Sequence, residues 1–422
     1  MKNIATKVYT SVFVIVLLVG LYVPSYKINL VVQLGALFIY LVFEKPSVSK
    51  GFLQQFTPFL YIVIVGFIGT FIHHYHKMDI VKDIIYLFKP MISLLLAYLL
   101  YKKINDFKVF SKTIVIAGVC SALIHFLIIK FLVDPYSGSI NATREFTKDN
   151  FLEVFAIFFL IYYKKFKGEP LFSNPYFKWA ALLLIGVSSL LYFSRTMIVL
   201  AAILAVSLQG YTMITKKTMG FIGAGVLAIG LLYVYLYSTN VRRNADGVEA
   251  FLYKIKIAPE EVFQTQVSLA NKKALWDHWR GYEASRAMYL MEQNSSSYVF
   301  GTGIGSMVNL KFFAPISDDI KGIKYISELH NGYAFIFYKT GLIGLLIYFF
   351  ILYRWYMYVY KKRTFVTLLI SSIGVIYLFT TLTITGIYNK RDIIILILGA
   401  LFAFYEQEQK TKNIAPEESV QA

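Results

Sequence analysis

One histidine of this sequence stands where a polar segment gives way to a long apolar one. His330 belongs to the stretch Ser327–Leu345, SELHNGYAFIFYKTGLIGL, and is followed by a glycine-bearing turn. A neutral imidazole can accept a proton near pH 7, so His330 is a candidate general base for deprotonating a hydroxyl group. The alternative is that His330 only forms a structural hydrogen bond, as isolated histidines more often do.

Arginines form the second group of side chains that could do chemistry. A guanidinium group stays charged at physiological pH and binds phosphate oxygens in bidentate fashion, which suits a lipid pyrophosphate at a membrane surface. The alternative for each arginine is a pair with a lipid headgroup or a nearby carboxylate. A functional role is favoured most for Arg195, because it is flanked by apolar residues and burying a charge there is expensive. The candidates are Arg144, Arg195, Arg280, Arg286 and Arg391, with Lys89 as a further cation.

The elements that must position these side chains are apolar. The chain has 422 residues, of which 57% are hydrophobic, and it contains many apolar runs of the roughly 20 residues that cross a bilayer. A soluble fold would need an oversized core, and an outer-membrane barrel would need short alternating strands. We therefore predict an all-α polytopic membrane protein. Its twelve expected spans lie near residues 8–25, 28–43, 52–73, 83–101, 112–133, 150–164, 178–194, 196–214, 219–238, 341–359, 364–386 and 392–406.

Basic residues between the expected spans indicate the orientation. With the amino terminus inside, most lysines between spans fall in cytoplasmic turns, in agreement with the positive-inside rule, and both termini are cytoplasmic. The one long connection is then external, and its amphipathic segments predict one or two short helices on the membrane surface. The expected regions are 1–238 with nine spans, 239–340 with the external loop and a re-entry segment, 341–407 with three spans, and 408–422 as a polar cytoplasmic tail without regular structure.

This topology gathers the candidate residues on one side of the membrane. External loops are usually poor in such charges, so the arginines collected there need an explanation. Lys89 lies within a span but near its external end, from which a lysine can extend its amine outward. The residues on the external side are Arg144, Arg195, Arg280, Arg286, His330 and Arg391.

The charge distribution and the cysteine content argue against a nucleic-acid-binding protein and against a disulfide-bonded one. The formal net charge of +18 follows from basic turns that set orientation, so we expect no nucleic-acid partner. Cys120 is the single cysteine, which excludes an intrachain disulfide. The cluster His73–His76 has no carboxylates nearby and is interpreted as polar capping. The sequence therefore predicts neither a metal nor a cofactor.

Four segments, taken in chain order, resemble one known superfamily. TREFTKDNFLEVFAIF places an arginine and an asparagine before a span, and SRTMIVLAA places Ser-Arg at the start of a span. WRGYEASRAMYLMEQNSSSYVFGTGIGS is an arginine-bearing helix that ends in a Gly-x-Gly turn, and HNGYAFIFYKTGLIGL follows it. This pattern resembles the O-antigen ligase and polymerase superfamily. The resemblance covers about residues 141–345, and twelve spans also suit that superfamily.

The resemblance implies a metal-independent, inverting glycosyltransferase. Its donor is a glycan on undecaprenyl pyrophosphate, and its active site lies on the periplasmic face of the bacterial inner membrane. Arg195 and Arg280 would bind the pyrophosphate and stabilise its charge as it leaves, while His330 would deprotonate the acceptor hydroxyl. Arg280 is preferred because the family's loop arginine is usually followed by a pattern like RGYEA, and Arg286 is the alternative.

Further residues and partners follow from the same resemblance. Asn331 is expected to orient His330 or the acceptor, and Arg144 to help hold the donor. Lys89 and Arg391 are further substrate-binding candidates. The expected partners are the lipid-linked donor, an acceptor glycan and membrane lipids, with a chain-length regulator as an additional candidate.

Two functions within the superfamily remain open. A polymerase joins one lipid-linked glycan to another lipid-linked repeat, whereas a ligase moves the finished glycan onto lipid A-core. The RGYEA segment favours the polymerase. A flippase for lipid-linked oligosaccharides is the alternative from a different class, but it predicts repeated halves and polar residues near the membrane midplane, and the sequence shows neither.

Overall fold

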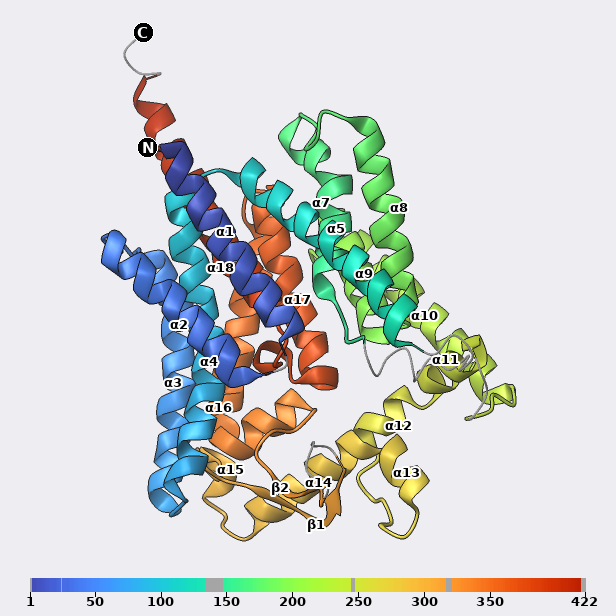
Figure 1. Ribbon diagram of the computed structural model, residues 1–422. Coiled ribbons are helices and arrows are strands. Elements are labelled where there is room, and N and C mark those ends of the chain that lie inside the picture. The colour runs from blue at the N-terminus through green and yellow to red at the C-terminus, as the bar shows by residue number, and fades with distance from the viewer. Residues whose placement is uncertain (1, 24, 134–146, 244–246, 316–320, 419–422) are drawn as a thin grey trace.

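Helices make up most of the structure, a computed structural model that describes residues 2–23, 25–133, 147–243, 247–315 and 321–418. The long helices pack into one bundle (Figure 1). Its members are α1 (Lys2–Tyr22), α2 (Tyr26–Phe43), α3 (Lys50–Ile72), α4 (Lys77–Ile104), α5 (Phe107–Leu132), α7 (Phe151–Lys167), α8 (Pro175–Leu191), α9 (Arg195–Leu208), α10 (Lys216–Ser238), α16 (Gly332–Tyr356), α17 (Phe365–Ile384) and α18 (Ile394–Glu418). Two short 3-10 helices, η1 (Met357–Tyr360) and η2 (Gly386–Tyr388), follow α16 and α17.

The helical content and the long apolar helices confirm the prediction of an all-α membrane protein, but they do not confirm all twelve expected spans. Among the described residues, eight helices are long and apolar enough to cross a bilayer: α1, α2, α3, α4, α5, α10, α16 and α17. The apolar helices α8 and α9 are shorter, and α7 has only 17 residues. In α18 the apolar run ends near Glu406, although the helix continues to Glu418, into the segment expected to be an unstructured tail.

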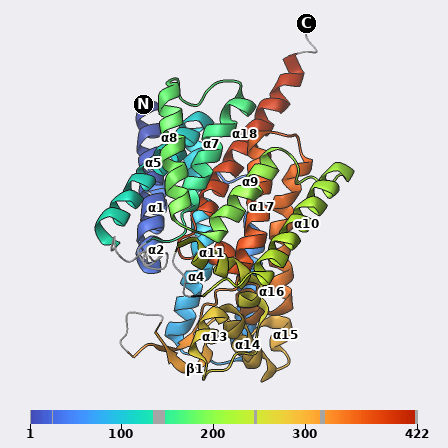
Figure 2. The same ribbon diagram turned by 90° about the vertical axis from the view of Figure 1, so that its right-hand side faces the viewer.

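The helices differ widely in how deeply they are buried. α4 packs along α18, and α17 packs between α16 and α9. In the apolar part of α17, 78% of the residues are buried inside the protein, compared with 6% in α10. α10 therefore lies at the edge of the bundle (Figure 2), where its exposed leucines and valines suit contact with lipid chains.

A compact segment joins α10 to α16, and we call residues 247–331 the connecting module. It contains α11 (Gly247–Lys256), α12 (Ala258–Phe263), α13 (Lys272–Asp277), α14 (Trp279–Glu292), α15 (Ser297–Phe300), β1 (Val308–Ala314) and β2 (Ile323–Ile326). One or two short helices were expected, but the described part of the module has five. The antiparallel β1–β2 hairpin was not expected. In Figure 1, α13, α14 and the hairpin lie at one end of the bundle, and the first turn of α1 and the last of α18 lie at the other.

The glycine-rich segment Gly301–Ser306 fixes the module against the bundle. The N–H of Gly303 donates to the carbonyl of Lys339 in α16 at 3.0 Å, and the N–H of Ile304 donates to the carbonyl of Gly66 in α3 at 3.2 Å. Gly303 has a φ of +94°, and a Cβ there would lie 2.3 Å from the backbone nitrogen of Thr70. Only glycine fits this position, so GTGIGS is a tight packing element between two helices.

The same contact breaks α16 at Gly341. This residue has a φ of +64°, and a Cβ on it would lie 2.2 Å from the carbonyl oxygen of Val299. Just before the break, Lys339 forms a buried ion pair with Asp83 of α4, with side chains that are 1% and 4% exposed. Asp83 also accepts a hydrogen bond from the N–H of Gly305 at 2.7 Å. These contacts hold the first part of α16, residues 332–340, in a fixed position.

Replacing Gly303 by alanine tests this packing. We expect Gly303→Ala to lower the free energy of unfolding by about 2–4 kcal/mol. Alanine would have to adopt a positive φ that is unfavourable for it, and its Cβ would clash with the backbone of Thr70. Gly230→Ala on α10 is the matched control, since a Cβ there meets nothing within 4 Å, and it should be neutral or slightly stabilising. Denaturation of the purified protein in detergent measures both. Equal stability of the two variants would show that the segment is not tightly packed.

Candidate functional site

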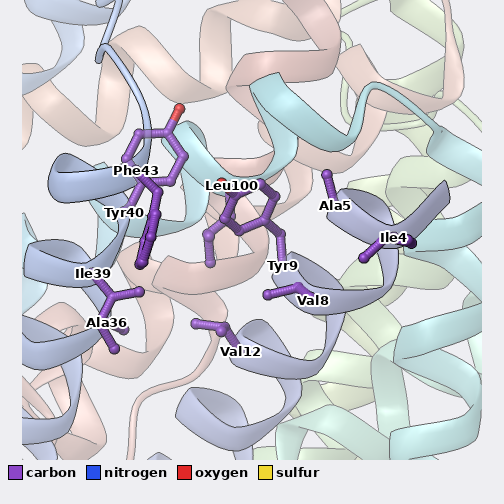
Figure 3. Close-up of a pocket in the computed structure, with 10 residues that line it drawn as sticks. All are labelled: Ile4, Ala5, Val8, Tyr9, Val12, Ala36, Ile39, Tyr40, Phe43 and Leu100. Carbon is purple, nitrogen blue, oxygen red and sulfur yellow. The ribbon is translucent and has the colours of Figure 1, made fainter. Parts of the chain in front are cut away.

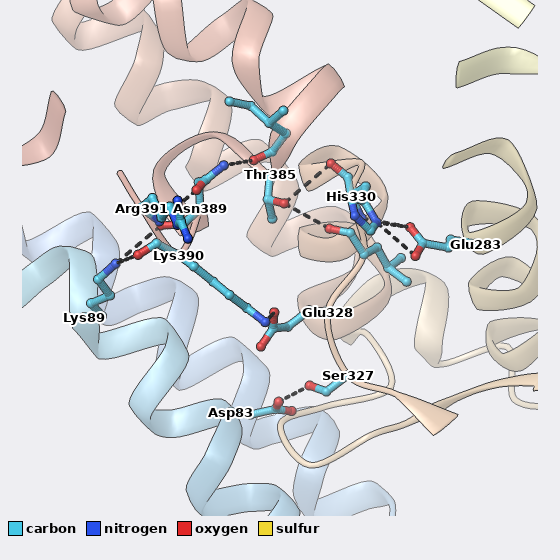
Figure 4. Close-up of polar contacts among 12 residues, drawn as sticks. Asp83, Lys89, Glu283, Ser327, Glu328, His330, Thr385, Asn389, Lys390 and Arg391 are labelled. Atoms are coloured by element: carbon cyan, nitrogen blue, oxygen red, sulfur yellow. Dashed lines mark hydrogen bonds and ion pairs between the residues drawn. The ribbon is translucent and has the colours of Figure 1, made fainter. Parts of the chain in front are cut away.

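His330 lies two residues before α16 and is held by Glu283 of α14. Its Nδ1 atom is 3.0 Å from both carboxylate oxygens of Glu283, and its backbone N–H donates to the same carboxylate at 2.9 Å. The Glu283 side chain is 1% exposed, whereas that of His330 is 54% exposed. Figure 4 shows the two side chains facing each other. The histidine is therefore fixed from the buried side and open on the other.

This geometry determines what His330 can do. A carboxylate next to Nδ1 favours the tautomer in which Nδ1 carries the proton, which leaves Nε2 as a proton acceptor. The same carboxylate stabilises the imidazolium that forms when Nε2 takes up a proton. The sequence prediction named His330 but missed Glu283. Its spacing was the available signal, because Glu283 follows Arg280 by one helical turn and so shares a face of α14 with it.

The two arginines expected to act together meet at one carboxylate. Glu261 of α12 forms ion pairs with Arg195, with an N–O distance of 2.9 Å, and with Arg280. Arg195 is the first residue of α9, placed there by the N-cap Ser194, whose hydroxyl accepts from the N–H of Met197 at 3.2 Å. The guanidinium of Arg195 also donates to the carbonyl of Lys254 in α11. Two guanidinium groups thus hold one anionic group.

The end of α17 connects these arginines with His330. Arg280 donates through Nε to the carbonyl oxygen of Thr383 at 2.8 Å. Two residues later, the N–H of Thr385 donates to the carbonyl oxygen of His330 at 2.9 Å. Arg195, Arg280 and His330 are therefore gathered by α12, α14 and the end of α17, although 135 positions separate the first from the last.

Two other candidates have structural roles. Arg286 donates through Nε to the carbonyl of Asn309 in β1 at 3.0 Å and stacks on the ring of Tyr289, 4.7 Å from its centroid. It packs α14 against the hairpin, so Arg280, and not Arg286, is the one that shares Glu261 with Arg195. Asn331 caps α16, where its side-chain oxygen accepts from the two N–H groups that follow Gly332. The contact that orients His330 comes from Glu283 instead.

The remaining candidates lie on the loop after α17 or beside it. Lys89 does not extend outward as expected, because it is 4% exposed and its amine donates to the carbonyls of Asn389 and Lys390. Lys390 pairs with Glu328 at 2.9 Å (Figure 4). The backbone N–H of Arg391 donates to the side chain of Asn389 at 2.9 Å, and burial lowers the pKa of its guanidinium. Arg144 lies outside the described residues.

An apolar cavity lies apart from the candidate residues described above. Its volume is about 400 Å³, and it opens between α1 and α2, where Val8, Val12 and Ile39 line it (Figure 3). Such a surface suits a lipid chain, and the polar side chains of its lining are Tyr9 and Tyr40, of which Tyr9 donates its hydroxyl to Glu44. Among the described residues, no group of three or more His, Cys, Asp or Glu side chains is placed to hold a metal ion.

Comparison of the chain with models of known protein families and with curated proteins finds no match.

The shared carboxylate of Glu261 gives a stability prediction. We expect Glu261→Ala to lower the free energy of unfolding by about 1–3 kcal/mol, because two largely buried guanidinium groups lose a charged partner. Glu249→Ala is the control, since Glu249 pairs with Arg242, which is 75% exposed, and such a pair contributes little. Denaturation in detergent measures both variants. A Glu261 variant as stable as the Glu249 variant would contradict the prediction.

Proposed function

We propose that this protein is a membrane glycosyltransferase that moves a glycan from undecaprenyl pyrophosphate to a hydroxyl group of an acceptor glycan. The observation that supports it most is the arrangement of His330 on Glu283 next to two arginines that share Glu261. A base and a paired guanidinium site are the two groups that a metal-independent transfer from a pyrophosphate needs. The preferred function within this class is an O-antigen or surface polysaccharide polymerase, as the resemblance of the RGYEA segment suggests.

The proposed location is the bacterial inner membrane, with twelve spans and the site on the periplasmic face. The first turn of α1 and the last of α18 lie at the opposite end of the bundle from α14 (Figure 1). This arrangement is compatible with two cytoplasmic termini and a periplasmic connecting module. The basic turns between helices support the same orientation.

In the proposed reaction, His330 accepts a proton from the acceptor, and Arg195 and Arg280 stabilise the leaving group. The acceptor hydroxyl attacks the anomeric carbon of the donor sugar, and its proton passes to Nε2 of His330. The bond between that carbon and the pyrophosphate oxygen breaks, and the electron pair leaves with the lipid pyrophosphate. Arg195 and Arg280 stabilise the charge that develops there, which is the electrostatic contribution expected of preorganised guanidinium groups. Attack from the side opposite the leaving group inverts the anomeric configuration.

The carboxylate of Glu261 indicates how an anion would be bound. It stands where a phosphate oxygen of the donor would sit between the guanidinium groups of Arg195 and Arg280. A pyrophosphate carries more charge and more acceptor oxygens than a carboxylate, so it competes well for the same donors. The two guanidinium groups are therefore already placed to bind an anion in the resting state.

Substitution of His330 and Arg280, with Arg286 as the control, tests the function. In a strain deleted for the gene, His330→Ala should reduce glycan polymerisation at least a hundredfold, because general base catalysis contributes about 10²–10⁴. Arg280→Ala should also abolish long chains, whereas Arg286→Ala, which loses only packing contacts, should retain them. The measurement is the ladder of glycan lengths on a gel at matched protein levels. Normal ladders from His330→Ala and Arg280→Ala would contradict the proposal.

The deletion strain also separates the polymerase from the ligase. Loss of a polymerase leaves lipid A-core carrying a single repeat. Loss of a ligase leaves lipid A-core without glycan, while lipid-linked polymer accumulates. The second pattern would assign the alternative function, an O-antigen ligase, to the same site.

Glu283 is expected to act as a positioning residue for His330. Glu283→Gln keeps a hydrogen-bond acceptor near Nδ1 but removes the charge that stabilises the imidazolium, so kcat should fall about 10- to 100-fold with little change in KM for the donor. Glu292→Gln, at an exposed position of the same helix, is the control and should leave both constants unchanged. Kinetics with the purified enzyme and lipid-linked repeat measure them. A change confined to KM would show that Glu283 contributes to binding instead.

A further inference from the structure

A small polar cavity lies where the ends of α1, α5, α7 and α8 meet. Its volume is about 140 Å³, several times the 10–15 Å³ or so that one water molecule requires. It is lined by side chains that include Tyr22, His125, Asn150 and Tyr192. Unlike the apolar cavity between α1 and α2, it can accommodate a small ligand rich in hydrogen-bonding groups.

Two buried polar atoms on its wall lack a partner among the described residues. They are Nε2 of His125 and Oδ1 of Asn150, in side chains that are 1% and 2% exposed. Their other atoms are engaged: Nδ1 of His125 lies 2.8 Å from the hydroxyl of Ser188, and Nδ2 of Asn150 donates to the hydroxyl of Tyr192 at 3.1 Å. Buried polar groups are normally satisfied, so two orphaned atoms on one cavity indicate a ligand that hydrogen-bonds to both.

The side chains around the cavity are held rigidly. Glu153, which is fully buried, accepts hydrogen bonds from Asn150 at 3.1 Å and from Tyr192 at 3.2 Å. The ring of Tyr192 stacks on that of His125, with centroids 3.7 Å apart. A site whose walls are fixed by their own contacts loses little entropy when a ligand binds.

The chemistry of the wall selects a hydroxylated ligand. The free carbonyl oxygen of Asn150 requires a hydrogen-bond donor, and the free nitrogen of His125 accepts or donates according to its tautomer. A hydroxyl group can do both, whereas a phosphate offers only acceptors at neutral pH. The charged residues of the lining are of both signs, Lys148, Asp149 and Arg391, so the hydrogen-bonding groups of the wall, and not its net charge, select the ligand. A ring bearing several hydroxyl groups, such as a pyranose, meets all of these conditions.

Contacts through α9 and the loop after α17 link the cavity to the proposed catalytic site. The N–H of Asn150 donates to the sulfur of Met197, two residues after Arg195, at 3.4 Å, and Asp149 interacts electrostatically with Arg195. Arg391 also lines the cavity, and it belongs to the loop whose first residue, Thr385, binds the backbone of His330. A ligand in the cavity would therefore lie next to elements that carry both the base and the arginines.

We propose that this cavity binds one sugar residue of the lipid-linked glycan. The inference rests on the proposed function and adds a specific subsite to it. It assigns recognition of the glycan to His125, Asn150 and Tyr192, separately from recognition of the pyrophosphate by Arg195 and Arg280.

A pair of tryptophan variants tests the subsite. Ile128 lines the cavity, so Ile128→Trp should fill it. Leu127, the adjacent residue, is 55% exposed and does not line the cavity, so Leu127→Trp is the matched control. His125→Phe, which keeps the ring stacking and removes both nitrogens, is a second variant in case Ile128→Trp does not fold. Two probes are used with protein in nanodiscs: lipid-linked repeat extracted from the deletion strain, and undecaprenyl pyrophosphate without sugar.

The expected result is a difference between the two lipids. Ile128→Trp and His125→Phe should bind the repeat-bearing lipid at least tenfold more weakly than the wild type, and sugar-free undecaprenyl pyrophosphate within twofold of it. Leu127→Trp should match the wild type for both. Unchanged binding by Ile128→Trp and His125→Phe would show that only water occupies the cavity and would overturn the inference, as would equal losses for both lipids. Binding of neither lipid by the wild type would overturn the proposed function as well.

Discussion

The arrangement of the site depends on the carboxylate of Glu261. It joins α9 of the bundle to α14 of the connecting module, through Arg195 and Arg280. Guanidinium groups in a largely buried position need a counter-charge, since desolvation of an unpaired ion is costly. One carboxylate between two arginines satisfies this need and still leaves an excess of positive charge. The same contact therefore stabilises the junction and keeps it attractive to an anion.

The position of His330 depends on a second constraint, the break in α16. The glycines of Gly301–Ser306 and Gly341 let the module approach the backbone of α16 closely, and the Lys339–Asp83 pair anchors the helix from the side of α4. The first segment of α16 is thus fixed at both ends, by Asn331 at its start and by Lys339 near its end. A base supported in this way keeps its orientation without help from the substrate, which is what preorganisation requires.

The sequence was informative about helices and about residue types, and much less about partners. Long apolar runs predicted the bundle because length and hydropathy are local properties. Arg195 stood out because a charge flanked by apolar residues is costly to bury. His330 stood out because it precedes a span, and Arg280 because its RGYEA segment resembles the superfamily. Glu261 and Glu283 did not stand out, since acidic residues in a polar segment usually face water. Their importance comes from contacts with residues 66 and 47 positions away. The spacing of Glu283 from Arg280 places these two side chains on one face of a helix, but no local pattern identifies the distant partner of either carboxylate.

The same limit explains the candidates that the structure places in other roles. Asn331 and Arg286 lie beside the proposed catalytic residues in sequence, but a helix cap and a packing contact take up their side chains. Lys89 could have extended outward from its span, yet two backbone carbonyls of the loop after α17 hold its amine inside. In each case, residue type and sequence spacing identify the candidate. The tertiary contacts of its side chain then determine whether it has a chemical or a structural role.

Under the proposed function, the exposure of His330 sets a requirement on the order of events. Its imidazole is about half exposed while Glu283 behind it is buried, so in the resting state the base faces water. A base that is open to water would promote hydrolysis of the donor as readily as transfer to a sugar. Transfer is favoured only if the acceptor glycan covers His330 and excludes water before the bond to pyrophosphate breaks. The connecting module, which holds Glu283 and Arg280 on one helix, is the part of the protein placed to couple binding of the two glycans to that step.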